Sequence, residues 1–296
     1  MRPPFRIALF DSGGGGFSIL RCLLEKGIRG EFSYFADDAL LPYGRLTDEQ
    51  IVNRVVGQYS SVFAQVEPDL LVVACNTAST LVLPGLRRIL EFPVVGVVPA
   101  IKPAAESSKS RRIALLATPA TVTRSYIDDL VTRFAQDCQV QRVSAGNLVE
   151  EAEQYLSSGE LNEANLDKLL SGIFLRDPLL DRIVLGCTHF PLLTGQLRES
   201  LIRLGREEAQ LVDSGPAVAS RVAFLLGLHG AEEQDCQSRT LSHIHLYFTG
   251  TRQDASLWER KCLRACGSIA DEKLFVQAFH SPIESEMAIV QSVGKD

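Results

Sequence analysis

Residues 69–75 read Asp-Leu-Leu-Val-Val-Ala-Cys, and residues 181–187 read Asp-Arg-Ile-Val-Leu-Gly-Cys. Each stretch is a short apolar run between an aspartate and a cysteine, and each is followed within two residues by a threonine. A second pair supports the repeat, because Arg6-Ile-Ala-Leu9 recurs as Arg112-Ile-Ala-Leu115. The spacing predicts two similar units of about a hundred residues, a size at which each unit can hold its own core.

The fold class predicted from the whole chain is α/β. Short apolar runs alternate with amphipathic stretches, which is typical of parallel strands covered on both faces by helices. One helix is expected to begin at Thr47, with Gln50 completing a capping box. Residues 243–248 alternate polar and apolar side chains, so a half-buried strand near a sheet edge is expected there. The other expected strands are 7–10, 32–36, 70–74, 94–98, 113–117, 140–143, 183–186 and 210–212.

The composition of the chain argues against a nucleic-acid partner and against a membrane span. The 296 residues include 36 acidic and 30 basic side chains, and the net charge of −6 argues against nucleic-acid binding through a broadly basic surface. No apolar stretch approaches the roughly 18–20 residues of a membrane span, and no signal peptide is expected. The seven cysteines are an odd number without a dense framework, which favours reduced thiols in a cytoplasm.

The candidate chemistry lies where the strands end. In open α/β sheets, ligands bind beyond the carboxyl ends of the strands, and both Cys75 and Cys187 fall there. A lone cysteine at such a place is usually a small buried hydrophobe. Two cysteines at the same repeat position instead suggest opposite walls of one cleft, where they could form a disulfide, hold a metal or carry out acid/base work.

The glycine run Gly13 to Gly16 follows the first strand together with Asp11 and Ser12. It fits neither the dinucleotide nor the P-loop spacing, so a phosphate loop is not expected. Two interpretations stay open: a tight turn that needs positive φ, or a backbone that approaches a small anionic ligand while Asp11 and Ser12 point into the crevice.

A metal site is not expected. His189 is the only histidine near either strand-end cysteine, and no Cys-x-x-Cys pair is present. Cys262 and Cys266, with His243, His245 and His280, fit no standard zinc spacing, so packing and a solvated strand face are expected there. Glu153 and the Cys262/Cys266 pair are expected to be dispensable for chemistry.

Between residues 6 and 228 the chain resembles the glutamate racemases, which are cofactor-independent amino-acid racemases. The two cysteine motifs are the specific part of the resemblance, and residues 97–104 are most similar to proteobacterial members. The matching motifs are Leu9-Phe-Asp-Ser-Gly-Gly-Gly-Gly16, Pro42-Tyr-Gly44, Val73-Ala-Cys-Asn-Thr-Ala-Ser79, Pro93-Val-Val-Gly-Val-Val-Pro99 and Leu185-Gly-Cys-Thr-His-Phe-Pro-Leu-Leu193.

The resemblance implies two α/β domains that face each other across a cleft, one formed by residues 1–98 and 209–296 and the other by residues 99–208. Glutamate would lie between the two cysteines, where one thiol removes the α-proton and the other delivers a proton to the opposite face. Cys75 would deprotonate D-glutamate and Cys187 would deprotonate L-glutamate.

The resemblance also implies partners for the thiols. Asp11 would assist Cys75 and His189 would assist Cys187, and the further carboxylate falls on Glu150 rather than on neighbouring Glu151. No cofactor is implied, and the D-glutamate formed would supply peptidoglycan synthesis in the bacterial cytoplasm. The substrate-binding residues implied are Asp11, Ser12, Tyr43, Gly44, Asn76, Thr77, Thr118, Thr121, Thr188 and His189.

Two other functions stay open from the residues alone. A racemase of the same superfamily could act on aspartate or another small acidic substrate, since a pair of cysteines does not by itself select the length of the substrate's side chain. A non-catalytic ligand-binding protein could carry structural cysteines on the same scaffold. Whether a peptidoglycan precursor activates the protein, and whether it is a monomer or a homodimer, does not follow from the sequence.

Overall fold

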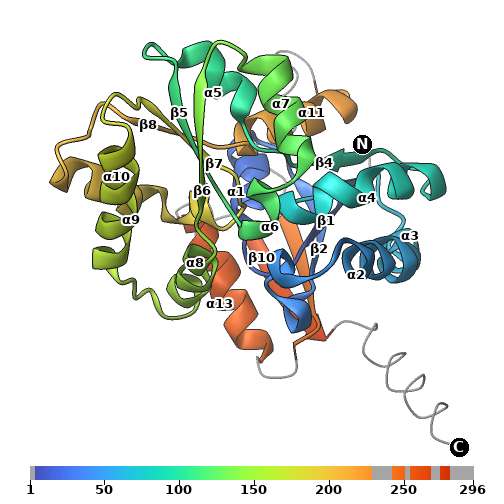
Figure 1. Ribbon diagram of the computed structural model, residues 1–296. Helices are drawn as coiled ribbons and strands as arrows, with labels where there is room; N and C mark the ends of the chain where they lie inside the picture. Colours follow the sequence, from blue (N-terminus) through green and yellow to red (C-terminus); the bar gives the residue numbers. More distant parts are fainter. Residues whose placement is uncertain (1–3, 229–241, 251–253, 268–273, 281–296) are drawn as a thin grey trace, which may run out of the picture.

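The computed structural model describes residues 4–228, 242–250, 254–267 and 274–280, and it contains two parallel sheets (Figure 1). The first sheet has six strands in the order β10-β9-β2-β1-β3-β4. Its strands are β1 (Phe5–Asp11), β2 (Gly30–Ala36), β3 (Leu70–Val73), β4 (Val94–Gly96), β9 (Ser242–Phe248) and β10 (Leu274–His280).

The second sheet has four strands in the order β6-β5-β7-β8, and every pairing in both sheets is parallel. The α/β prediction is therefore confirmed. Its strands are β5 (Arg112–Ala117), β6 (Gln139–Ser144), β7 (Arg182–Leu185) and β8 (Gln210–Val212).

Helices connect these strands, as parallel pairing requires. Thr47 and Gln50 form the expected capping box at the start of α2. A π-helical stretch, Asn53–Tyr59, follows α2, and the short 3₁₀ turns are Asp38–Leu40, Tyr43–Arg45 and Phe190–Leu193. The α-helices are α1 (Phe17–Glu25), α2 (Asp48–Val52), α3 (Ser60–Gln65), α4 (Asn76–Ile89), α5 (Ile101–Ser107), α6 (Pro119–Val122), α7 (Ser125–Phe134), α8 (Asn147–Ser158), α9 (Glu163–Arg176), α10 (Thr194–Arg203), α11 (Gly215–Leu225) and α13 (Ala255–Cys266).

Each sheet is buried on both faces, which explains the continuous apolar runs in its central strands. In β1, Ile7 and Leu9 face the core that includes α1, α11 and α13, whereas Ala8 and Phe10 face the core that includes α3 and α4. The strand β9 shows the expected alternation of buried and half-buried residues and lies one strand from the edge.

One expected boundary between the units is wrong. Residues 210–212 form β8 and pair with β7 in the second sheet, whereas the expected boundary at residue 209 assigned them to the first unit. The chain returns to the first unit after Val212, where α11 packs beside α1. The short apolar run identified a strand but could not identify its neighbour.

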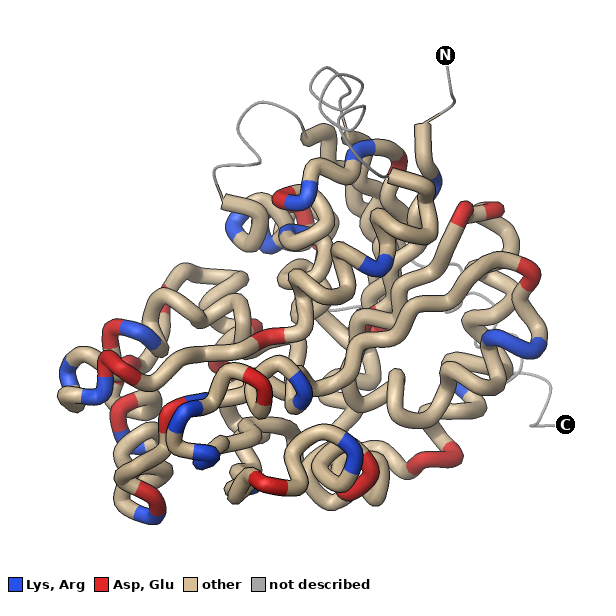
Figure 2. Tube along the Cα trace, turned by 90° about the horizontal axis from the view of Figure 1, so that it is seen from above, with Lys and Arg blue, Asp and Glu red and all other residues tan. Residues whose placement is uncertain are grey.

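Within the part of the chain that the structure describes, no helix has the length and apolar character needed to cross a membrane. Acidic and basic residues are interspersed around the periphery in the view from above (Figure 2).

Candidate active site

Both strand-end cysteines lie against one small cavity. Cys75 occupies the N-cap of α4 just after β3, and Cys187 follows β7 by two residues. Their exposed fractions are 5% and 7%, so both thiols are buried. The cavity is lined by Ser12, Pro42, Tyr43, Gly44, Cys75, Asn76, Thr77, Thr118, Val149, Cys187, Thr188 and His189.

The thiol of Cys75 sits among weak hydrogen-bonding groups. It lies 3.8 Å from Ser12 Oγ, to which it can donate, and its sulfur accepts the backbone N–H of Ala78 at 3.5 Å. Burial, and then the nearby charge of Asp11, raise the pKa of Cys75 to about 12. Cys75 is therefore a thiol at neutral pH in this buried site.

The thiol of Cys187 faces a histidine. Cys187 Sγ lies 3.8 Å from His189 Nδ1, and His189 Nε2 lies 2.8 Å from Glu153 Oε1. Burial disfavours the imidazolium, but the hydrogen bonds with Cys187 and Glu153 outweigh it and raise the pKa of His189 well above its usual value. The imidazole is thus placed to exchange a proton with the Cys187 sulfur.

Asp11 is buried at the end of β1 behind the cavity wall. Its Oδ1 accepts the backbone N–H of Gly13 at 2.9 Å, and its Oδ2 accepts the hydroxyl of Thr188 at 3.0 Å. Burial raises the pKa of this carboxyl to about 6. Asp11 therefore acts on Cys75 through its charge, while its hydrogen bond reaches the loop that carries Cys187.

The glycine run lets the backbone of the loop after β1 approach side chains of the second unit closely. None of the residues Gly13 to Gly16 has positive φ, so the interpretation as a turn that needs positive φ is wrong. A Cβ on Gly13 would meet Glu153 Oε1 at 2.6 Å, and one on Gly15 would meet His189 Nδ1 at 2.4 Å. Gly13 and Gly15 are needed because these two side chains approach the loop closely.

Glu153 is the site residue that the sequence reasoning missed. Its Oε1 accepts the backbone N–H of Gly14 at 2.6 Å as well as bonding His189, and its Oε2 lies 2.9 Å from Lys261 Nζ. Burial opposes ionisation, but the His189 hydrogen bond and the charge of Lys261 lower the pKa of Glu153 to about 2. These contacts argue against the expectation that Glu153 is dispensable, and no motif in the sequence marked it.

Glu150 lies outside the cavity lining. Its side chain is 54% exposed and forms an ion pair with Arg45. The neighbouring Glu151 accepts a hydrogen bond from Asn165 at 2.7 Å. Only Glu153, one helical turn beyond Glu150, faces the histidine, because its side of α8 is turned toward α13 and the glycine loop.

The three predicted threonines of this region form one cluster. The hydroxyl of Thr77 lies 3.3 Å from that of Thr118 and 3.2 Å from that of Thr121, and the last two are 2.9 Å apart. Thr77 and Thr118 line the cavity, whereas Thr121 lies behind them. Thr121 therefore supports the wall rather than forming it.

Tyr43 lines the cavity, and its hydroxyl is bonded to a residue outside the lining. The hydroxyl donates to Asp37 Oδ2 at 2.6 Å, and Arg54 Nε donates to the same oxygen at 2.8 Å. The buried ion pair between Asp37 and Arg54 therefore holds Tyr43, and with it the Pro42–Gly44 segment, against the cavity. The sequence reasoning also missed Pro42 and Val149, which supply apolar parts of the lining.

Comparisons with known proteins identify the family of the chain. Residues 46–222 match the family described as Asp/Glu/Hydantoin racemase. A glutamate racemase of Shewanella sp. (strain MR-4) is 46% identical over 228 residues, which cover 77% of this chain and 82% of the relative. The chain belongs to the Asp/Glu/hydantoin racemase family.

Further members of the family resemble the chain over most of its length. A glutamate racemase of Shewanella sp. (strain ANA-3) is 41% identical over 268 residues, covering 90% of this chain and 96% of the relative. The crystal structure of Escherichia coli glutamate racemase with L-glutamate and the activator UDP-MurNAc-Ala is 37% identical, with a TM-score of 0.75 and coverage of 93% and 99%. The Thermus thermophilus glutamate racemase in complex with β-chloro-D-alanine is 27% identical, with a TM-score of 0.66 and coverage of 94% and 99%.

The C-terminal cysteines and histidines of this family member lie in packing environments. Cys262 and Cys266 are buried in the core of the first unit. His243 lies 5.5 Å from the ring of Phe275, centroid to centroid. Among the described residues, no cluster of three or more His, Cys, Asp or Glu side chains is arranged to hold a metal ion.

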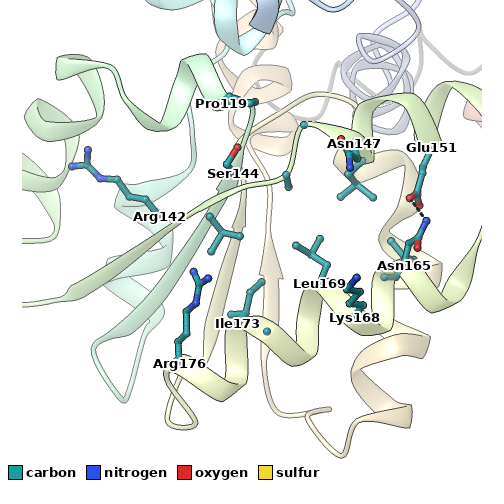
Figure 3. Close-up of a pocket in the computed structure, with 16 residues that line it drawn as sticks. Pro119, Arg142, Ser144, Asn147, Glu151, Asn165, Lys168, Leu169, Ile173 and Arg176 are labelled. Carbon is teal, nitrogen blue, oxygen red and sulfur yellow. Dashed lines mark hydrogen bonds between the residues drawn. The ribbon is translucent and has the colours of Figure 1, made fainter.

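A larger hollow lies apart from the thiols, between β6, the start of α8, and α9 (Figure 3). It encloses about 790 Å³, whereas the space between the cysteines is only about 10 Å³. Arg142, Lys168 and Arg176 lie along it, and Arg142 pairs with Asp128. Neither cysteine lines this hollow, so its size does not mark the candidate active site.

Proposed function

We propose that the chain interconverts L-glutamate and D-glutamate by moving the α-proton between two thiols, without a cofactor. The observation that carries this proposal is that Cys75 and Cys187, at equivalent strand ends of two sheets, line one cavity. Membership of the racemase family and the glutamate racemases at 41–46% identity support glutamate over aspartate as the substrate.

The chemistry needs help for each thiol, because a C–H beside a carboxylate is a very weak acid and a free thiol is mostly protonated at neutral pH. With L-glutamate, His189 takes the proton of Cys187, and the resulting thiolate removes the α-proton. Cys75, a thiol in the closed site, then donates its proton to the opposite face of the carbanion. With D-glutamate the roles exchange: Asp11 takes the proton of Cys75, the resulting thiolate removes the α-proton, and the thiol of Cys187 donates its proton to the opposite face of the carbanion.

Glu153 replaces Glu150 as the carboxylate of this mechanism. It holds the Nε2 side of His189, so that Nδ1 points toward Cys187. This is the arrangement of a base oriented by a third group, in which the carboxylate fixes the tautomer and the direction of the ring. Glu153 does not touch the cavity, so we assign it a positioning role.

The cavity walls supply groups for the charged substrate. Asn76 Oδ1 is buried without a hydrogen-bond partner among the described residues, and we assign it to the substrate ammonium. The start of α4 and the hydroxyls of Ser12, Thr77 and Thr188 suit the carboxylates. Because the closed cavity has room for about one water molecule, the two units must separate to admit glutamate.

The biological setting belongs to the proposal as well. D-glutamate would supply peptidoglycan synthesis, and the six cysteines of the described residues are free thiols, which suits a reducing cytoplasm. We further propose that a peptidoglycan precursor activates the reaction, because the E. coli relative was crystallised with such an activator. Adding UDP-MurNAc-Ala to the assay below tests this step, and an unchanged rate would contradict it.

The experiment for the main proposal is circular dichroism of L-glutamate incubated with the purified protein and no added cofactor. The ellipticity should decay to zero, because the enantiomers have equal free energy and the equilibrium mixture is racemic. L-aspartate under the same conditions should change far more slowly. Stable ellipticity with glutamate, or faster loss with aspartate, would contradict the proposed substrate.

A further inference from the structure

Lys261 on α13 is almost fully buried, with 1% of its surface exposed. Lysine is rarely buried to this extent unless it is paired. Its ammonium lies 2.9 Å from Glu153 Oε2 and 4.6 Å from the centre of the Trp258 ring. The side chain therefore brings a positive charge from the C-terminal region to the carboxylate that holds His189.

Three elements meet on the Glu153 carboxylate. The loop after β1 contributes the N–H of Gly14, the loop after β7 contributes His189, and α13 contributes Lys261. Gly14 and Lys261 belong to the unit of the six-stranded sheet, whereas Glu153 and His189 belong to the other unit. The ion pair thus crosses from one unit to the other beside the thiols.

The position of Lys261 is fixed by its neighbours on α13. One turn further along, Arg264 donates to the backbone carbonyls of Tyr155 at 3.1 Å and of Leu156, near the end of α8. Trp258 and Cys262 are buried in the core that also contains Leu156. Figure 1 shows α13 lying beside α8, so the ammonium is held against Glu153 by the packing of the whole helix.

We infer that Lys261 is a positioning residue of the racemase, whose ammonium holds the Glu153 carboxylate across the boundary between the units so that it orients His189 toward Cys187. The inference rests on the proposed function for its effect on turnover. It makes α13, which carries no recognisable motif, a part of the proton-transfer machinery on the Cys187 side.

The charged groups around Glu153 predict the direction in which the pKa of His189 should change when Lys261 is replaced. The ionisable groups around Glu153 and His189 are Asp11, Tyr34, Cys187 and Lys261, and the charge of Lys261 also acts on Asp38. Removing the one ammonium from this buried set favours the protonated form of every group that remains. A neutral residue in place of Lys261 should therefore raise the pKa of His189 and move the pH profile of kcat/KM to higher pH.

The test compares Lys261→Met, which keeps the length without the charge, with Lys261→Arg, which keeps the charge. The matched control is Arg264→Met, which removes another cation from α13, one that donates to backbone carbonyls of α8. His189 is one of five histidines, and its imidazole can be titrated by ¹⁵N NMR and assigned with His189→Asn.

In Lys261→Met we expect the His189 pKa to rise by about one unit or more and kcat to fall by about tenfold or more, with KM nearly unchanged because Lys261 does not line the cavity. Lys261→Arg should retain most of kcat. Arg264→Met should lower the denaturation midpoint but leave the His189 titration in place. A folded Lys261→Met with wild-type titration and kcat, or an equal shift in Arg264→Met, would overturn the inference.

A double-mutant comparison covers the case in which Lys261→Met does not fold, because Glu153→Gln with Lys261→Met leaves no unpaired buried charge. If Lys261 acts through Glu153, this double variant should have nearly the kcat of Glu153→Gln alone, and a further tenfold loss would overturn the inference. Should the wild-type protein fail to racemise glutamate, the proposed function fails, while the His189 titrations still decide the role of Lys261.

Discussion

Replacing Gly15 with alanine should displace His189, the partner of the Cys187 thiol, and should reduce activity far more than it reduces the stability of the fold. Gly15 does not have positive φ, so an alanine backbone fits the loop without strain. The added Cβ would lie 2.4 Å from His189 Nδ1 and 2.7 Å from Thr188 Oγ1, whereas ordinary contacts begin at 3.4 Å. The imidazole must therefore move by about 1 Å, away from the position in which it faces Cys187.

The expected loss of activity is large and the expected loss of stability is moderate. A displacement of about 1 Å at a catalytic contact can reduce the rate by roughly 100-fold. Overpacking of this kind costs about 1–3 kcal/mol, partly offset by about 0.4–1 kcal/mol from the stiffer unfolded chain. We therefore predict that Gly15→Ala unfolds at a slightly lower urea concentration and has about 1% of the wild-type kcat.

The assay combines initial racemisation rates by circular dichroism with urea denaturation. The control is Gly57→Ala, because Gly57 is helical and exposed and a Cβ there would meet nothing within 4 Å. It should keep full activity and gain about 0.5–1 kcal/mol. If Gly15→Ala kept a rate within about threefold of wild type, the close approach of the loop to His189 would not matter for catalysis, and the reasoning would be refuted.

The remaining predictions concern the thiols and their partners. Cys75→Ala and Cys187→Ala should each abolish racemisation with the far-ultraviolet spectrum unchanged, because a methyl group cannot carry a proton, and substantial residual turnover would remove that thiol from the mechanism. Asp11→Asn should raise the primary isotope effect on kcat/KM for α-deuterated D-glutamate relative to the L-enantiomer, and His189→Asn should give the reverse order; the same order in both would contradict the assignment of one partner to each thiol. Because burial raises the pKa of Asp11 to about 6, the folded chain binds this proton more tightly than the unfolded chain, so the contribution of Asp11 to stability should fall by about 2 kcal/mol as pH rises from about 4 to 7. Urea denaturation at both pH values should show that wild type loses about this much more stability than Asp11→Asn, and an equal loss in the two proteins would contradict the raised pKa of Asp11. Racemisation should survive EDTA and borohydride, and complete loss under either would contradict a cofactor-independent reaction.

The sequence was sufficient for every described strand except β10 (Leu274–His280), which it did not predict, and for the place of both thiols. Apolar runs such as those in Leu70–Val73 and, after Arg182, in Arg182–Leu185 predict buried parallel strands, and the residues just after such strands lie at their carboxyl ends, where ligands bind. The repeat therefore placed Cys75 and Cys187 without any contact information.

The residues that the sequence could not assign depend on contacts between distant segments. Glu150 and Glu153 lie on one short stretch of α8, and only the docking of α13 and the glycine loop decides which carboxylate meets His189. Lys261 is a further example, because nothing local marks a lysine whose partner lies more than a hundred residues away. Gly14 and Gly15 show the same limit, since each is required by side chains of the other unit rather than by its own φ angle.

The central claim is that two different thiols handle the proton on the two faces of the α-carbon. It is tested most directly by racemising unlabelled L-glutamate in D₂O and analysing both enantiomers early in the reaction by chiral chromatography and mass spectrometry. Two separate thiols predict that the D-glutamate formed carries deuterium at the α-carbon, delivered by Cys75, while the remaining L-glutamate largely keeps its protium. D-glutamate that carries the original α-proton of the substrate would indicate a single base that transfers it across the carbon, and would contradict the account.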